Sequence, residues 1–315
     1  MAGPTRAGGH PDYSSTGTIG FIPAIWSANM APKFYEATVF GAIANTNWEG
    51  EIKNMGDVVE IRVIPDIAVT DYNVGGGINY QKPSSTKIEM AVDQAISFGF
   101  EVADVDGYQS DLKLMTKFSE DASEQMKIAV DRRVLGYTGN GFAGASDANI
   151  ASTNRGLTAG AISGDIDLGT SGTPESITSA TILDYIVDLG VVLDEANIPE
   201  TGRWLLLPAW ACGLIKKSDL KDASLSGDGT SILRNGLIGE VDRFPIFRSN
   251  NLPTSSTYTK IYAGHTEGLA FASQIAKVEN LRNPNDFGDL VRGLNIFGYK
   301  VVNPEALAVG YIAKG

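Results

Sequence analysis

Residues 57–93 have the sequence DVVEIRVIPDIAVTDYNVGGGINYQKPSSTKIEMAVD, in which two short runs alternate between apolar and polar side chains. The apolar positions are Val59, Ile61 and Val63 in the first run, and Ile88, Met90 and Val92 in the second. Alternation with a period of two is typical of β-strands, so the runs predict two strands that pair in antiparallel fashion. The connection between them, with consecutive glycines at 75–77, is too long for a tight hairpin turn.

A two-stranded ribbon of this kind has almost no core of its own. Because an isolated ribbon is at best marginally stable in water, we expect the excursion formed by residues 57–93 to lie on another body. The residues alone leave two interpretations open. The ribbon either folds back on its own domain or lies on a different molecule.

A long amphipathic helix is predicted downstream, from about Gly107 to Tyr137. Its apolar residues recur at spacings of three and four and form one stripe: Leu112, Met115, Phe118, Ala122, Met126, Ala129, Val130 and Val134. About 30 residues at ~1.5 Å per residue make a rod of roughly 45 Å, more than twice the usual helix length. We expect Leu112, Met115, Phe118, Met126 and Val130 to form the core-facing side of this rod.

Mixed α and β elements are predicted in the rest of the chain. Upstream, Asn29 caps a helix that continues past Pro32 and ends at Asn45. Downstream, the predicted elements are a helix at 178–196, a buried strand at 203–207, a helix at 209–217, short strands near 244–247 and 260–263, and an alternating region at 294–312. The segment that ends at Gly293 shows no single period. The sequence therefore predicts an α+β fold.

The net charge limits the function classes. Length allows about two domains, and a hydrophobic fraction of 43% excludes wholesale disorder. The formal charge is 25 − 37 = −12, which argues against a protein that mainly grips nucleic-acid phosphates. An acidic wall that encloses nucleic acid without gripping it is compatible with this charge.

Cysteine usage and hydropathy limit the cellular context. Cys212 is the single cysteine, which excludes an intramolecular disulfide framework and multi-cysteine metal sites. No run approaches the ~18 consecutive apolar residues of a membrane span, and residues 1–20 lack the apolar centre of a signal peptide. We therefore expect a soluble cytosolic chain.

No catalytic, cofactor-binding or metal-binding site is predicted. The GNGFAG run at 139–144 matches G-x-G-x-x-G, but it follows a predicted helix instead of a strand, which is the wrong context for a dinucleotide site. The SDLK runs at 110–113 and 218–221 lack the companion motifs of serine acyl-transferases. His265 has no partner at metal-ligand or general-base spacing. We expect no enzyme and no cofactor; the enzyme alternative, an α+β hydrolase, lacks a nucleophile–base pair.

Three segments of the second half carry a family resemblance. They are ANIPETGRWLLLPAWACGLI (196–215), GLIGEVDRFPIFRSNNLP (236–253) and AGHTEGLAFASQIAKVENLRNPNDFGDLVRGLNIFGYKVVNPEALAV (263–309). Together with the order of arm, glycine-tipped excursion, long helix and mixed α/β region, these segments resemble the major capsid proteins of tailed phages. That family shares the Hong Kong 97 fold.

The resemblance implies a division of the chain into parts. Residues 1–28 would be an N-terminal arm, and residues 48–101 an extended β-hairpin called the E-loop. The peripheral domain, with the long helix as its spine, would take 29–47, 102–144 and 270–298, and the axial domain 145–269 and 299–315. The E-loop tip, consisting of Gly75, Gly76, Gly77, Tyr80 and Lys82, would contact a neighbouring subunit.

The resemblance also implies a function. Copies of the chain would form pentamers and hexamers of an icosahedral virion capsid, assembled in the host cytoplasm. The partners would be a separate scaffolding protein, a portal protein and double-stranded DNA enclosed without sequence-specific contacts, with no membrane. The alternative within the same fold is the shell of an encapsulin-like nanocompartment.

Some family members join a loop lysine covalently to an asparagine of another subunit, beside a glutamate. Here Lys82 and Lys87 lie in the loop, and Asn283 and Asn285 lie in the returning segment. The sequence identifies no matching glutamate, so cross-linking stays open.

Overall fold

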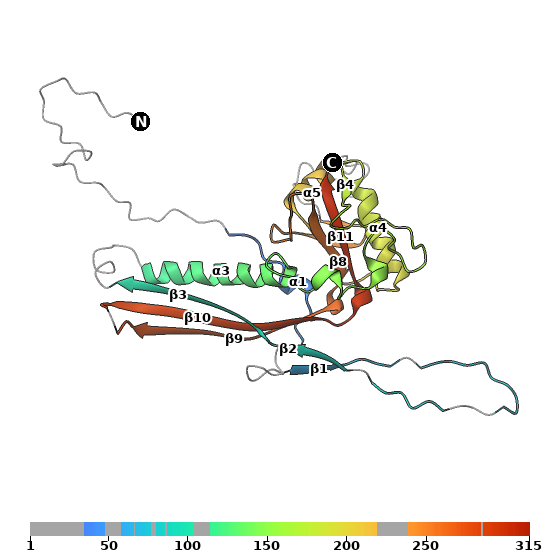
Figure 1. The fold of residues 1–315 in the computed structure, drawn as a ribbon, viewed down its shortest axis with the longest axis horizontal. Coiled ribbons are helices and arrows are strands. Elements are labelled where there is room, and N and C mark those ends of the chain that lie inside the picture. The colour runs from blue at the N-terminus through green and yellow to red at the C-terminus, as the bar shows by residue number, and fades with distance from the viewer. Residues whose placement is uncertain are drawn as a thin grey trace, which may run out of the picture.

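The computed structural model describes residues 35–47, 58–65, 67–76, 80–85, 87–103, 114–218, 239–284 and 286–315. The helices are α1 (Phe40–Ile43), α3 (Leu114–Leu135), α4 (Ile182–Glu195) and α5 (Ala209–Lys217), with 3₁₀ turns at Ala145–Asp147, Ser152–Asn154, Thr266–Gly268 and Pro304–Ala306. The strands are β1 (Val58–Arg62), β2 (Lys87–Ala91), β3 (Gln94–Ala103), β4 (Glu175–Ile177), β5 (Arg203–Leu207), β6 (Glu240–Val241), β7 (Phe244–Arg248), β8 (Thr259–His265), β9 (Leu269–Arg282), β10 (Gly288–Val301) and β11 (Leu307–Lys314). The fold is α+β, with an elongated part joined to a rounder part (Figure 1).

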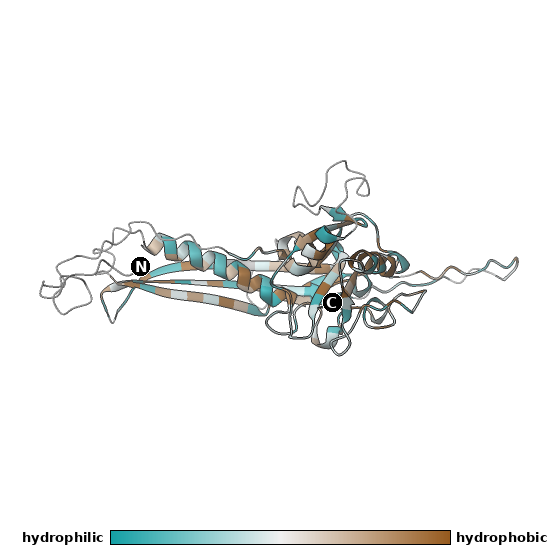
Figure 2. Cartoon of the chain, turned by 90° about the horizontal axis from the view of Figure 1, so that it is seen from above, coloured by the Kyte–Doolittle hydropathy of each residue, from teal (hydrophilic) through white to brown (hydrophobic). Residues whose placement is uncertain are grey.

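The elongated part is a three-stranded antiparallel sheet with α3 along one face (Figure 1). The strand order is β3-β10-β9, so β3 and β9 are the two edges. The ring of Phe118 in α3 meets Phe100 of β3 edge-on, with the ring centroids 5.8 Å apart. Hydrophilic and hydrophobic residues mix along α3, as expected for a helix with one covered side (Figure 2).

The hairpin of β1 and β2 covers part of the other face of this sheet. The two strands are antiparallel, with Val59 opposite Met90 and Ile61 opposite Ile88. The buried contact consists of Val59, Ile61, Met90 and Val92 from the hairpin region and Ala270, Ala272 and Ile296 from β9 and β10. The base of the excursion is therefore anchored on its own chain, as the first interpretation of the ribbon required.

The rounder part surrounds a six-stranded sheet of order β4-β11-β8-β5-β7-β6. All five residues of β5, RWLLL, are buried. Helix α4 packs on this sheet, and the hydroxyl of Tyr185 donates a 2.9 Å hydrogen bond to the carbonyl of Leu168. The C-terminal end of α3 joins the same core through Val130, Val134 and Leu135. One continuous core thus connects the rounder part with the end of the elongated part.

Most predicted elements of the second half are confirmed. The helix at 178–196 corresponds to α4, and the strand at 203–207 and the helix at 209–217 correspond to β5 and α5. The antiparallel pair β1–β2 is also confirmed. α3 is described from Leu114 to Leu135, and the predicted start of this helix lies outside the described residues, as does the predicted arm at 1–28.

Three sequence-based predictions differ from the structure. The helix expected up to Asn45 is limited to Phe40–Ile43 among the described residues, because the amides of Val39 and Phe40 bond to a side chain of α3. Residues 94–101, placed in the E-loop, form most of β3, which pairs with β10. The segment without a single period, which ends at Gly293, contains the long strand β9 and the start of β10. The consecutive residues Ala270 and Phe271 of β9 are both buried, because both faces of the sheet are covered there.

At Gly298 the backbones of the sheet and the hairpin lie close together, and this contact yields a prediction. A Cβ atom there would lie 2.4 Å from the carbonyl oxygen of Ala91, a backbone atom that cannot rotate away. We expect Gly298→Ala to lower the free energy of unfolding by about 1–3 kcal/mol, measured by chemical denaturation. The matched control is Gly99→Ala in β3, where the nearest atom to an added Cβ is 3.8 Å away. Equal stability of the two variants would contradict this packing.

Candidate intersubunit surface

The connection between β1 and β2 exposes an unusual amount of apolar surface. Its described residues belong to no helix or strand, and Figure 1 shows two long legs running away from the rest of the chain. Six large apolar side chains of this connection have exposed fractions from 67% to 96%: Ile64, Ile67, Val69, Tyr72, Val74 and Tyr80. A monomer rarely exposes apolar side chains so densely, so these legs have the character of a surface that another molecule covers.

The predicted loop-tip residues lie in this connection as far as they are described. Gly75 has φ +86°, a conformation that side chains other than glycine rarely adopt, and the amide of Gly76 donates to the carbonyl of Asn73 in a tight turn. Tyr80 and Lys82 are exposed on the returning leg, and Gly77 lies outside the described residues. Gly75 and Gly76 therefore serve the turn itself, whereas Tyr80 and Lys82 are available for contact.

The predicted side of the long helix is buried unevenly. Val130 is buried in the main core, Met115 and Met126 are half-buried, and Phe118 remains 37% exposed beside Phe100. Leu112 lies outside the described residues. Ile128 is buried although it was not assigned to the stripe. The N-terminal half of α3 thus covers the sheet only partly, and its C-terminal end belongs to the main core.

Asp131 of α3 holds three segments together, and we call this arrangement the Asp131 clamp. Its Oδ1 accepts hydrogen bonds from the amides of Val39 (2.9 Å) and Phe40 (3.0 Å), and its Oδ2 accepts one from Nδ2 of Asn251 (2.8 Å). Asn251 in turn accepts from Nε of Arg132 through its Oδ1. The side chain of Asp131 is fully buried, and this burial raises its pKa despite the three donors. The pattern of apolar positions could not reveal this residue, because nothing in the local sequence marks a single aspartate of an amphipathic helix as buried.

A second polar contact anchors the turn after α3 to the six-stranded sheet. Asp147 is buried, with its Oδ1 at 2.6 Å from Nζ of Lys260 in β8 and its Oδ2 accepting a 2.6 Å hydrogen bond from the hydroxyl of Tyr311 in β11. Burial and the bond to Asp147 raise the pKa of Tyr311. Nearby, the hydroxyl of Tyr262 donates to the carbonyl of Leu135. These contacts fix the direction in which α3 leaves the rounder part.

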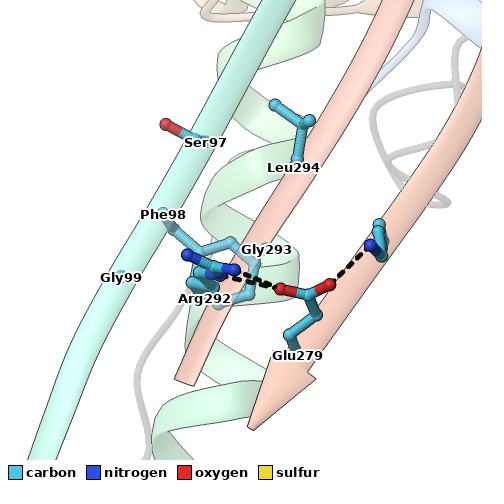
Figure 3. A pocket seen from close by; sticks show the side chains of 8 residues that line it. Ser97, Phe98, Gly99, Glu279, Arg292, Gly293 and Leu294 are labelled. Atoms are coloured by element: carbon cyan, nitrogen blue, oxygen red, sulfur yellow. Dashed lines mark hydrogen bonds and ion pairs between the residues drawn. The ribbon is translucent and has the colours of Figure 1, made fainter. Parts of the chain in front are cut away.

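The face of the three-stranded sheet opposite α3 carries an open groove beyond the β1–β2 hairpin. Its volume is about 580 Å³, and Figure 3 shows the residues that line it: Ser97, Phe98, Gly99, Lys277, Glu279, Arg292, Gly293 and Leu294. Glu279 accepts bonds from Lys277 and from Arg292, and these two cations lower its pKa. Two cations against one carboxylate leave the groove with a local positive charge on a chain whose net charge is −12.

The structure places a glutamate beside Asn283 that the sequence analysis did not identify. Nδ2 of Asn283, at the tip of the β9–β10 hairpin, donates a 2.5 Å hydrogen bond to Oε1 of Glu101 in β3. The two residues are 182 positions apart and meet only because β3 and β10 pair. Lys82 and Lys87 belong to the excursion region, and no described contact joins either lysine to this pair.

Nothing in the described part of the chain resembles a catalytic or metal centre. No group of three or more potential metal-ligating side chains occurs there. Cys212 is buried, and burial raises the pKa of its thiol, so it is a poor nucleophile. His265 holds a local turn, with Nε2 at 2.8 Å from the carbonyl of Thr201 and Nδ1 accepting from the amide of Glu267. Among the described helices, none is long and apolar enough to cross a membrane.

The chain is similar to known proteins in its three-dimensional fold. No family model matches the sequence, and no curated protein matches it. A chain of Mycobacterium phage Che8 superposes with a TM-score of 0.74 at 27% identity, covering 92% of this chain and 96% of that one. A chain of the capsid of Cyanophage P-SCSP1u gives a TM-score of 0.65 at 15% identity, covering 98% and 100%. This chain has the fold of phage capsid proteins.

Further capsid structures share the fold. A chain from the capsid of a native GTA particle gives a TM-score of 0.66 at 14% identity, covering 95% of this chain and 99% of that one. The resemblance to tailed-phage major capsid proteins is thereby confirmed at the level of the whole chain. Capsid proteins are in general structural proteins and not enzymes, in agreement with the prediction of no enzyme.

The Asp131 clamp yields a prediction about the stability of this capsid fold. Asp131→Asn replaces one acceptor oxygen with an NH2 group that faces Nδ2 of Asn251, so two donors oppose each other in a buried site. We expect the free energy of unfolding to fall by about 1–3 kcal/mol, measured by chemical denaturation. The control is Glu124→Gln, which removes a charge of the same helix at its exposed ion pair with Lys127 and should have almost no effect. An unchanged Asp131→Asn protein would show that the clamp is not needed.

Proposed function

We propose that this chain is the major capsid protein of a tailed phage and that its copies self-assemble into an icosahedral shell around double-stranded DNA. The observation that carries the proposal is the exposed apolar excursion on a chain whose whole length matches capsid structures. Surface of this kind has little use in a monomer and is accounted for when each copy covers its neighbour.

We propose the following assignment of the parts that the Hong Kong 97 fold implies. We assign the three-stranded sheet with α3 to the peripheral domain, with α3 as the spine helix, and the six-stranded sheet with α4 and α5 to the axial domain. The E-loop is the β1–β2 hairpin and its connection, residues 58–91, which is shorter than the segment 48–101 because β3 belongs to the peripheral sheet. The axial domains would cluster around the axes of pentamers and hexamers.

Many weak contacts are sufficient to hold such a shell. An excursion that lies on the next copy makes a heterologous contact, and heterologous contacts close into rings when the rotation permits. Each subunit then has several neighbours, so the contacts act together and the shell is more stable than any single interface. The extended shape of the elongated part suits a thin wall (Figure 1).

The charge of the chain fits a container for DNA. A net charge of −12 repels phosphates on average, so an acidic wall encloses DNA without adhering to it. In this proposal a separate scaffolding protein directs assembly in the host cytoplasm, a portal protein admits the DNA, and the product is the virion capsid. No membrane takes part.

The direct test is to express the chain, with and without a candidate scaffolding protein from the same genome, and to image the product by electron microscopy. We expect closed icosahedral particles. Particles isolated from the native source should contain double-stranded DNA that nuclease cannot digest until the shell is disrupted. A protein cargo in place of DNA would favour the encapsulin-like nanocompartment, and a chain that stays monomeric under every condition would contradict the shell function.

The excursion yields a second prediction. Replacing Val69, Tyr72 and Val74 with serine should leave the unfolding midpoint of the isolated subunit nearly unchanged, because these side chains are exposed. The same variant should form few or no particles by electron microscopy and light scattering. The matched control is Val69→Ile, Tyr72→Phe and Val74→Ile, which keeps the apolar surface and should assemble. Normal assembly of the serine variant would remove the intersubunit role of the excursion.

A further inference from the structure

Strand β9 is an edge strand whose outer side pairs with no other described strand along much of its length. In the order β3-β10-β9, only β10 pairs with β9 among the described strands. At its start, β9 already accepts another backbone on its outer edge: the amide of Asn45 donates to the carbonyl of Leu269, and the amide of Phe271 donates to the carbonyl of Asn45. No described segment continues this pairing along residues 277–281. An open edge of this length is a template for an added strand.

Both faces of β9 are also uncovered in this stretch. α3 packs mainly on β3 and β10, so Val278, on the α3 side of the sheet, remains 61% exposed. Leu281, on the opposite side, remains 42% exposed. The neighbouring Asn280 contacts Sδ of Met115, which marks the margin of the helix. The sheet therefore has the form of a layer from which one strand beside β9 is missing.

The same chain carries a strand-like segment that has no strand to pair with among the described residues. Residues 67–74, IAVTDYNV, are rich in β-branched and aromatic residues, yet they pair with no strand among the described residues. The principal described bonds between the two legs here are made by the side chain of Gln81 to the backbone of Ala68. The leg thus has exposed backbone groups and exposed apolar side chains together, which is the composition of a donor strand in β-augmentation.

We propose that residues 67–71 of one copy add as a fourth, antiparallel strand to the edge of β9 at residues 277–281 of a second copy. The inference rests on the proposed shell function and specifies the contact through which one subunit recognises the next. The donor must be a second copy, because Figure 1 shows the legs extending away from the free end of β9.

Charge and hydropathy select the register of this pairing. Antiparallel alignment with Asp71 opposite Lys277 brings unlike charges together and places Ile67 opposite the exposed Leu281. Thr70 then lies opposite Val278, on the side of α3. A shift by one residue would turn Asp71 toward the α3 side and leave Lys277 without it, so the charge pair specifies the face of the added strand.

Disulfide trapping tests the pairing directly. Thr70→Cys combined with Val278→Cys should give a ladder of disulfide-linked multimers on a non-reducing gel after assembly and mild oxidation. Cys212 contributes no background because it is buried. The control chain combines Thr70→Cys with Leu294→Cys in the open groove, and it should give no ladder if the leg pairs with the edge. A ladder only in the control would show that the leg lies on the sheet face and would overturn the inference.

Hydrogen exchange supplies a measurement that does not depend on cysteine geometry. Amides of a peptide covering 277–281 should exchange about tenfold more slowly in assembled shells than in unassembled subunits. The opposite edge strand, β3, should change much less. Shells without this protection would overturn the inference and leave the shell function standing. Protection without the Thr70–Val278 ladder would mean that another segment occupies the edge and would also overturn it. A chain that forms no shells would remove the proposed function and this inference together.

Discussion

The buried carboxylate of Asp131 is the interaction on which the arrangement of the two parts depends. It satisfies two backbone amides at the start of α1 and the side-chain amide of Asn251 beyond β7, so two distant segments meet at one helix. A buried charge without these donors would be costly, and buried amides without the carboxylate would be equally so. The clamp therefore orients α3 relative to the six-stranded sheet at the point where the core is continuous. Asp147 reinforces it on the other side of the α3 terminus, through Lys260 and Tyr311.

From this junction the elongated part projects as a layer that is incompletely covered. Near the junction, α3 covers one face of the sheet and the β1–β2 hairpin covers the other. Farther along, the groove at Arg292 and Leu294, the edge of β9 and the outer side of Phe118 are open to solvent. A sheet with open faces and edges cannot bury enough apolar surface by itself. The same chain carries a long apolar excursion, which makes copies of the chain the natural source of the missing cover.

The sequence signal was strong wherever one face of an element is buried. Val59, Ile61 and Met90 alternate with polar residues, and β1 and β2 were predicted as an antiparallel pair from that alternation. RWLLL was identified as a buried strand because Pro208 ends a short apolar run. β3 was assigned to the excursion although Ile96, Phe98, Phe100 and Val102 alternate clearly, which was the signal available to find it. β9 had no single period because the consecutive residues Ala270 and Phe271 are buried on opposite faces.

The sequence by itself determined the local elements and the existence of an apolar excursion too long for a hairpin turn, because periodicity and turn residues act over a few positions. Only the tertiary structure decided that the base of the excursion is anchored on β9 and β10, that Asp131 is a buried acceptor instead of a surface charge, and that Glu101 meets Asn283. The polar contacts among these join residues 91 to 182 positions apart. Which distant segments become neighbours is set by sheet order and by what each face must cover, and no local pattern contains that information.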